Sequence, residues 1–286
     1  MIPAAVAALR CPHCATALHL DGDALGCERG HRFDLARQGY VNLVAGAGTR
    51  HTGDDAAMLD ARERVLTAGL FEPLLAALAE TADAALVDAP ADRDAVIVDV
   101  GAGTGIQLAR LVANDHRRVG IAIDVSKPAA RRAAQVHPRV AAVLADAWQG
   151  LPVAEAGADL AVVAFAPRNG AELTRILAPH GRLLVAVPAR GHLRDLRERL
   201  GLLEVDADKK ERLAVQLTEH LELVADRTVA WQQRLEPWQA ADVVAMGPSA
   251  HHLDVAEVAA RLTGVGDPPR LDGDVRLLTL AHPDRR

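Results

Sequence analysis

The chain has 286 residues, a formal net charge of −6 at pH 7, and hydrophobic residues at 50% of its positions. This composition excludes an intrinsically disordered protein, and the length allows one large domain with a small one beside it. No run of about 18 apolar residues and no secretory leader is present, so we expect a cytoplasmic protein with no membrane partner. The acidic total does not favour general nucleic-acid binding, but the local cluster of Arg29, Arg32 and Arg37 suggests phosphate contacts.

All three cysteines lie in the first tenth of the chain. Cys11 and Cys14 form a C-x-x-C pair, and Cys27 and His31 follow with C-x3-H spacing. An odd number of cysteines in a cytoplasmic protein argues against disulfides. Three thiolates and one imidazole match a closed, tetrahedral, structural Zn²⁺ site, one per chain. His13 is a rival ligand, but it lies inside the C-x-x-C pair, where its reach is poor.

The next segments predict how this zinc site is joined to the rest of the chain. We expect Tyr40–Leu43 to form a strand that closes the zinc domain, and Ala45–Gly53 to form a flexible, glycine-rich connector. Helix periodicity follows from Asp55 to Ala68. The predicted boundaries are a zinc-binding, RNA-recognition domain over 1–44, a linker and connecting helix over 45–65, and a large domain over 66–286.

A glycine loop then follows a buried strand. Ala95–Val100 is a short β-branched run, and it leads into Gly101-Ala102-Gly103-Thr104-Gly105 and a helix pattern. Such a loop lets backbone approach a ligand at a helix start. The dinucleotide fingerprint G-x-G-x-x-G fails because Ile106 takes the last position. A glycine turn without a ligand is the alternative interpretation.

Two further strands end in acidic residues. Val119–Ile123 leads to Asp124, which is placed to accept hydrogen bonds from ribose hydroxyls. Ala141–Leu144 is followed by Asp146, a position beside adenine in enzymes that use S-adenosylmethionine (SAM), although Asp146 is equally suited to cap a helix. The ordered series of strand, glycine loop, and two acidic strand ends favours a nucleotide-type cradle.

The second half of the chain predicts an alternating α/β pattern with an antiparallel end. We expect strands at 159–165, 182–187, 221–231 and 274–281, and helices at 170–177, 237–244 and 255–262. The segment Phe165-Ala166-Pro167-Arg168-Asn169 ends the first of these strands, where substrate binds in this fold.

These motifs resemble one known family. The Cys11/Cys14/Cys27/His31 spacing, Arg32-Phe33-Asp34 and Gly39–Leu43 resemble the N-terminal domain of the RlmA family of 23S rRNA (guanine-N1)-methyltransferases. The resemblance continues through the glycine loop to about residue 200. Phe165–Glu172 and Gly201–Asp206 resemble the branch that includes the tylosin-resistance methyltransferase.

The resemblance implies a class I SAM-dependent methyltransferase, an α/β fold with a Rossmann-like doubly wound sheet and an antiparallel final strand, plus the small zinc domain. It implies methyl transfer to N1 of a guanosine in a 23S rRNA hairpin, with macrolide resistance as a possible consequence and a homodimer as a possible assembly. The implied cofactor-binding residues are Phe71, Asp99, Gly101, Gly103, Thr104, Gly105, Asp124, Asp146 and His192. Phe71 replaces the Tyr of the family, and a core role suits it as well; His192 equally suits a surface helix start.

The catalytic base is not identified by the sequence, and Phe165, Arg168 and Asn169 are the candidates for the catalytic site. Amino-group methyltransferases carry an N-P-P-Y type motif there, and its absence fits a ring nitrogen as the target. Two other functions stay open: a SAM-dependent methyltransferase of a small molecule, and a catalytically silent, zinc-containing RNA-binding protein.

Overall fold

The computed structural model describes residues 1–46, 48–202, 217, 219–247, 255–263 and 267–283. The motif quoted from Gly201 to Asp206 therefore lies outside the described residues from position 203 onward. Within the described part of the chain, no single helix is long and apolar enough to cross a membrane; the bent pair Ala56–Thr67 and Glu72–Ala85 passes that test only by combined length and composition.

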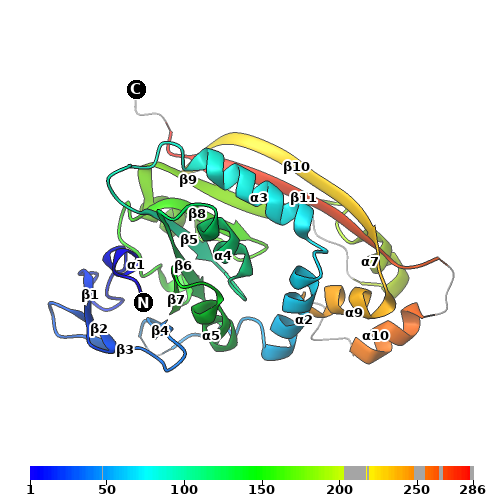
Figure 1. Ribbon diagram of the computed structural model, residues 1–286, viewed down its shortest axis with the longest axis horizontal. Helices are drawn as coiled ribbons and strands as arrows, with labels where there is room; N and C mark the ends of the chain where they lie inside the picture. Colours follow the sequence, from blue (N-terminus) through cyan, green and yellow to red (C-terminus); the bar gives the residue numbers. More distant parts are fainter. Residues whose placement is uncertain (47, 203–216, 218, 248–254, 264–266, 284–286) are drawn as a thin grey trace.

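A small module opens the chain and lies at one end of the long axis of the molecule (Figure 1). Helix α1 (Pro3–Ala7) precedes a three-stranded antiparallel sheet, β1 (Leu18–Asp21), β2 (Ala24–Cys27) and β3 (Arg32–Asp34). Gly22, with φ +61°, supplies the left-handed residue of the tight β1–β2 turn. We refer to residues 1–44 as the N-terminal module.

The main sheet contains eight strands among the described residues, in the order β10-β11-β9-β8-β5-β6-β7-β4. The strands from β9 to β4 are parallel, and β11 runs antiparallel to both β9 and β10. Their bounds are β4 (Val41–Asn42), β5 (Ala95–Val100), β6 (Arg118–Asp124), β7 (Val140–Leu144), β8 (Ala158–Ala164), β9 (Leu177–Pro188), β10 (Glu222–Arg234) and β11 (Arg270–Ala281). The β-branched runs expected as buried strands are confirmed, because β5 and β7 are buried along their whole length.

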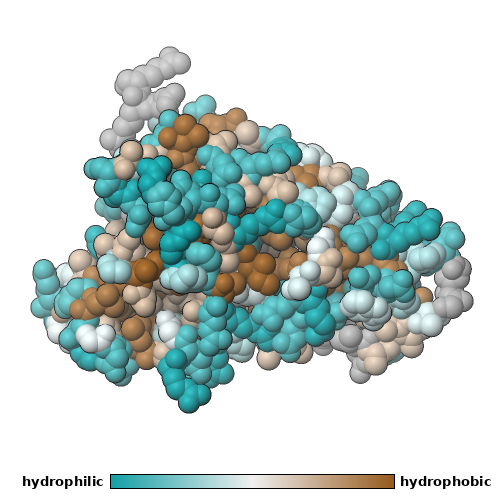
Figure 2. Space-filling model, viewed as in Figure 1, coloured by the Kyte–Doolittle hydropathy of each residue, from teal (hydrophilic) through white to brown (hydrophobic). Residues whose placement is uncertain are grey.

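Helices cover both faces of this sheet and enclose two hydrophobic clusters. They are α2 (Ala56–Thr67), α3 (Glu72–Ala85), α4 (Ile106–Ala113), α5 (Lys127–Val136), α6 (Gly170–Ile176), α7 (Arg194–Leu200), α9 (Pro237–Ala245), α10 (Val255–Leu262) and the 3₁₀ helix η1 (Ala147–Gln149). The side chains of Asp55, Ser126 and Asn169 cap α2, α5 and α6 by accepting backbone N–H bonds. Figure 2 shows that the same face of the molecule is mostly hydrophilic, with apolar residues gathered over the N-terminal module and the middle.

The strand expected at Tyr40–Leu43 forms at Val41–Asn42, but beyond one antiparallel β-bridge from Val41 to Leu35 it does not pair with the strands of the zinc domain. Val41 and Asn42 instead pair in parallel with Val143 and Leu144 of β7, so β4 is the edge strand of the main sheet. The physical reason is burial: Val41 is 0% exposed in a cluster shared with the strands of the main sheet. The edge of β7 also offers backbone groups that need partners.

The N-terminal module shares its hydrophobic core with the main sheet. Val6 and Leu9 belong to the same buried cluster as Ile121 of β6 and Val143 of β7. Leu9 also forms a β-bridge with Val153. Part of one face of the sheet is therefore covered by α1 and the chain that follows it.

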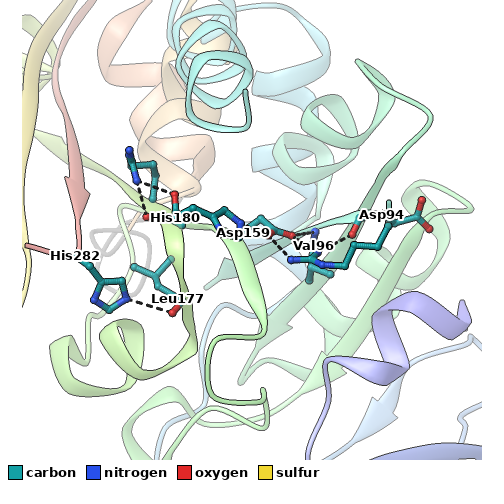
Figure 3. Close-up of polar contacts among 9 residues, drawn as sticks. Asp94, Val96, Asp159, Leu177, His180 and His282 are labelled. Atoms are coloured by element: carbon teal, nitrogen blue, oxygen red, sulfur yellow. Dashed lines mark hydrogen bonds and ion pairs between the residues drawn. The ribbon is translucent and has the colours of Figure 1, made fainter. Parts of the chain in front are cut away.

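A buried aspartate connects the amino ends of neighbouring parallel strands through hydrogen bonds (Figure 3). Asp159 begins β8 and is 1% exposed, and its carboxylate accepts two hydrogen bonds of 2.7 Å from Arg93. It also contacts His180 Nε2 at 2.7 Å and accepts the Val96 N–H at 2.8 Å. Burial opposes ionisation, but these partners lower the pKa of Asp159. This cluster is structural, because ligands of open α/β sheets bind at the opposite, carboxyl ends of the strands.

Candidate zinc centre and cofactor cleft

The predicted metal ligands converge in the N-terminal module. The ligand atoms of Cys11, Cys14, Cys27 and His31 all lie within 4.8 Å of one another. Cys14 Sγ and Cys27 Sγ are 3.7 Å apart, and His31 Nδ1 lies 3.5 Å from Cys11 Sγ and 3.4 Å from Cys27 Sγ. A tetrahedral Zn²⁺ with ordinary bond lengths needs about 3.8 Å between sulfurs and about 3.6 Å from sulfur to nitrogen. The donor set therefore fits Zn²⁺ in both chemistry and size.

The ionisation of these thiols favours metal binding at Cys27. Burial opposes the change, but hydrogen bonds from His31 and the Arg29 N–H lower the pKa of the Cys27 thiol to about 6. Burial raises the pKa of Cys11 to about 11, so that thiol needs a cation to become a ligand. His13 is not part of the cluster, because its ring stacks on Phe33 with 5.7 Å between centroids.

The glycine loop forms a cradle at the carboxyl end of β5. Gly101, Gly103 and Gly105 all have positive φ values, of +76°, +55° and +77°. An added Cβ would lie 2.3 Å from Ala166 Cβ at Gly101 and 2.7 Å from Arg62 Nη1 at Gly103. Thr104 is buried, and Gly105 occupies the N-cap position of α4. Glycine suits these three positions because of their left-handed conformation, and it suits Gly101 also because a Cβ there would meet Ala166.

Asp99 is an incompletely satisfied buried carboxyl group beneath this loop. It is 1% exposed, and among the described residues Oδ1 has no hydrogen-bond partner while Oδ2 is 3.4 Å from Gln107 Nε2. Burial, with a smaller contribution from Asp124, raises the pKa of Asp99 to about 7. Such a group is expected where a ligand donor completes the site.

Asp124 ends β6 and ties the glycine loop to the next helix. Its carboxylate accepts the N–H of Gly103 and the N–H of Ser126, both at 2.8 Å. Burial raises the pKa of Asp124 against these two hydrogen bonds. Arg62 of α2 lies close by, pairs with Asp54 at 2.5 Å and donates to the Met246 carbonyl oxygen at 2.8 Å.

Asp146 holds both the η1 helix and the connector. Its Oδ1 accepts the Trp148 N–H, as expected for a helix cap. Its Oδ2 accepts the Thr49 hydroxyl at 2.5 Å and lies 3.0 Å from His51 Nδ1. Burial opposes ionisation, but His51 and Thr49 lower the pKa of Asp146. Thr49 and His51, in the segment expected to be a flexible connector, therefore contact Asp146, a predicted cofactor-binding residue.

A chain of aromatic rings borders the cleft. Phe165 stacks on His192 with 5.7 Å between centroids, and Phe71 meets His192 edge-on at 6.2 Å and Trp231 edge-on at 5.4 Å. Phe71 and His192 are 3% and 7% exposed, whereas Phe165 is 46% exposed and has a φ of +54°. His192 is thus buried, which contradicts the alternative of a surface residue, while its role in cofactor binding stays a prediction; Phe165 presents its ring at the end of β8.

Arg168 and Asn169, the other two catalytic candidates, differ in how many of their hydrogen-bonding groups have partners. Asn169 forms one hydrogen bond at each end of its amide, since Oδ1 accepts the Glu172 N–H and Nδ2 donates to the Ala147 carbonyl oxygen. Arg168 has two buried nitrogens, Nε and Nη1, without a partner among the described residues. Burial lowers the pKa of its guanidinium. Arg168 is therefore open to an anionic or carbonyl partner, whereas the Asn169 side chain is held in place by its two contacts.

The structure brings most of the predicted cofactor residues to one edge of the sheet, at the carboxyl ends of β5, β6 and β7. Thr49, His51 and Arg62 are not predicted from the sequence, because each contacts a partner about 100 or more residues away. Trp231 is not predicted either, since its only signal is its rarity in an aromatic-poor chain.

The strand order and the glycine loop define the class. Six contiguous parallel strands, with the glycine loop at the end of β5, and an antiparallel β11 inserted between β9 and the edge strand β10, form the class I methyltransferase fold. The YcgJ protein of Bacillus subtilis has a similar fold, with a TM-score of 0.50 and 15% identity over 73% of this chain and 98% of that one.

The sequence comparisons give the family. Residues 9–45 match the zinc ribbon described as the N-terminal domain of RlmA. A protein of Micromonospora griseorubida named as a 23S rRNA (guanine-N1)-methyltransferase is 44% identical over 94% of this chain and 95% of its own length. The 23S rRNA (guanine(748)-N1)-methyltransferase of Streptomyces fradiae is 45% identical over 89% of each chain. The chain belongs to this family of 23S rRNA (guanine-N1)-methyltransferases.

Proposed function

We propose that this protein transfers the methyl group of SAM to N1 of a guanosine in a 23S rRNA hairpin. The observation that carries the proposal is the conjunction, in one chain, of the zinc ribbon and the glycine cradle with 44–45% identity to the two relatives. Bound SAM supplies an activated sulfonium methyl, so the protein mainly aligns the donor with N1.

The cleft residues fit the parts of SAM. The unpartnered Oδ1 of Asp99 suits the ammonium group, and Asp124 suits the ribose hydroxyls. The glycine loop leaves backbone free to approach, and Asp146, Phe71 and His192 border the remaining space. The cations of Arg62 or Arg168 suit the carboxylate of the methionine moiety or the guanine O6.

The target base is best placed at the end of β8. Phe165 is exposed on a strained left-handed residue beside Ala166, which contacts the glycine loop. An extruded guanine stacked on this ring would lie next to the donor site. In this proposal Zn²⁺ is held by the four ligands of the N-terminal module and stabilises its fold, and the module contacts the RNA hairpin.

Primer extension on 23S rRNA tests the proposal. Incubation with the protein and SAM should produce one new stop, because an N1-methyl group blocks Watson–Crick pairing by guanine. Guanosine 748, the residue named for the S. fradiae relative, is the expected position. SAM binding without any methylated rRNA would contradict the proposal and favour a small-molecule methyltransferase, whereas absence of SAM binding would favour a silent RNA-binding protein.

Two finer points rest on the resemblance to the tylosin-resistance branch. A bacterium that expresses this chain should tolerate more tylosin than one that expresses a Gly103→Val variant, whose side chain would meet Arg62. The protein is also proposed to be a homodimer, which light scattering measures directly.

A further inference from the structure

A surface hollow lies beside the aromatic chain, at the carboxyl end of β10 and the start of β11. Its volume is about 430 Å³, and it is lined by Arg194, Trp231, Gln232, Asp272, Gly273 and Asp274. This volume lies within the ordinary range of small-ligand sites. The hollow is next to His192, since Gly191 also lines it, but Phe71 and His192 stand between Trp231 and Phe165. We refer to it as the β10–β11 hollow.

Trp231 provides a fixed aromatic surface in this hollow. It pairs across the strands with Gly273, and a Cβ on Gly273 would lie 2.2 Å from the indole, so the ring covers the backbone of its partner. The indole Nε1 donates to the Leu70 carbonyl oxygen at 3.0 Å, which satisfies its donor and fixes its plane. A ring held in this way is a stacking surface for a planar base.

Asp274 provides an acceptor that the fold does not consume. Its Oδ2 accepts the Gly191 N–H at 2.9 Å, while Oδ1 has no hydrogen-bond partner among the described residues. In Asp272, by contrast, both oxygens already accept a hydrogen bond, Oδ1 from Gln232 Nε2 and Oδ2 from the Asp195 N–H. The hollow therefore contains one carboxylate that is positioned by the backbone and still able to accept.

Arg194 provides a cation at the rim. Its side chain is exposed at the start of α7, and the described residues include no ion-pair partner for it. An aromatic surface, a carboxylate with a free oxygen and an exposed cation together match a guanosine nucleotide. The ring stacks on the base, the carboxylate accepts N1–H and the N2 amine, and the guanidinium contacts a phosphate.

We propose that the β10–β11 hollow binds the guanine of a nucleotide that neighbours the methylated one in the substrate RNA. The inference rests on the proposed function and adds a specificity site to it. Neighbouring bases of an unstacked loop are splayed apart, and the aromatic chain offers two separated stacking surfaces for them, Phe165 and Trp231. The hollow then helps select which hairpin guanosine is methylated.

A coupling experiment between protein and RNA tests this inference. The Asp274→Asn variant keeps an acceptor for the Gly191 N–H but loses the charge, and it should raise KM for the hairpin about tenfold while SAM affinity stays unchanged. Inosine, which lacks the N2 amine, is then placed at each guanosine near the target in turn. At one neighbouring position inosine should raise KM of the wild type by a similar factor and add nothing further in Asp274→Asn.

Matched variants separate base recognition from a general structural effect. Asp226→Asn removes a carboxylate from the same pair of strands, β10 and β11, where Asp226 pairs with Arg276. This variant should leave KM and the inosine profile unchanged. Arg194→Ala should weaken RNA binding for every sequence and lower the salt slope by about one. The inference would be overturned if the inosine and Asp274→Asn effects on KM were additive at every position. It would also be overturned if the two effects were coupled at the target guanosine itself.

The proposed function and this inference fail in distinguishable ways. Absence of methyl transfer by the wild-type protein contradicts only the proposed function. The coupling between Asp274→Asn and inosine can still be measured without turnover, from RNA-hairpin affinity by fluorescence anisotropy. Normal methylation by Asp274→Asn, with wild-type KM and the wild-type inosine profile, contradicts the hollow alone.

Discussion

Asp99 and Asp159 are both buried aspartates on strands of the same sheet, and their surroundings shift their pKa values in opposite directions. Asp159 lies at the amino end of β8 and has a bidentate arginine, a histidine and a backbone N–H as partners. Asp99 lies at the carboxyl end of β5 with an unpartnered oxygen and a pKa raised to about 7. The first stabilises the fold, and the second costs stability that a cationic ligand can restore.

The Asp99→Asn variant tests this cost. In the wild type the unfolded chain releases the Asp99 proton near pH 4, and the folded chain holds it to about pH 7, so ionisation favours unfolding across that window. The variant lacks this contribution, so its unfolding free energy relative to wild type should rise between pH 5 and pH 8, by roughly 3 kcal/mol. Denaturant unfolding without SAM at both pH values measures the difference.

Asp159→Asn is the matched control for that measurement. The lowered pKa of Asp159 makes its contribution fully present above about pH 4, and this contribution is lost only as pH falls further. The variant should therefore be less stable than wild type at both pH 5 and pH 8, because the Arg93 and Val96 contacts are lost at each pH. A difference between Asp99→Asn and wild type that does not change from pH 5 to pH 8 would show that the Asp99 carboxyl group titrates normally.

At the scale of elements, the sequence predicted what short patterns determine. The buried strands β5, β6 and β7, the glycine loop and the ligand spacing at Cys11 and Cys14 depend on residues a few positions apart. The sequence did not predict the partner of β4, because nothing near Val41 distinguishes a strand that joins β7 from one that closes the module. The contacts of Thr49 with Asp146 and of Trp231 with Phe71 are likewise set by the topology.

Zinc removal tests how the module and the sheet are linked. β4 follows β3 directly, a β-bridge connects Leu35 to Val41, and the Leu43 N–H donates to the Leu144 carbonyl oxygen at 2.9 Å. Metal binding stabilises the module, so a chelator, or Cys27→Ser, should increase hydrogen exchange at the amides of β4 and Leu43. Amides of β5 and β6 should keep their protection. Unchanged exchange at β4 after complete zinc loss would contradict the link, and metal analysis should give one zinc per chain beforehand.

At the scale of the whole molecule, the shared core decides what the N-terminal module can do alone. Val6, Leu9 and Val41 pack with Ile121 and Val143, so removing the module would uncover the main sheet. The domain boundaries therefore stay a prediction, and RNA recognition by the module has to be tested in the full-length protein. The arginines of the module also differ in their availability for phosphate contacts, because Arg32 already pairs with Asp21, Asp23 and Asp34.

Arg29 and Arg37 are therefore the module's better candidates for phosphate contacts. Both are exposed, and neither has an ion-pair partner among the described residues. Replacing both by alanine should weaken hairpin binding and lower the slope of log K against log salt by about two, roughly one per lost contact, with zinc content and SAM affinity unchanged. Arg110→Ala with Arg227→Ala removes one half-buried and one exposed arginine, which pair with Glu72 and Glu80 on the large domain, and should leave the slope unchanged. An equal loss of slope in both double variants would mean that RNA binding follows total charge, and the module would then have no specific role in holding the hairpin.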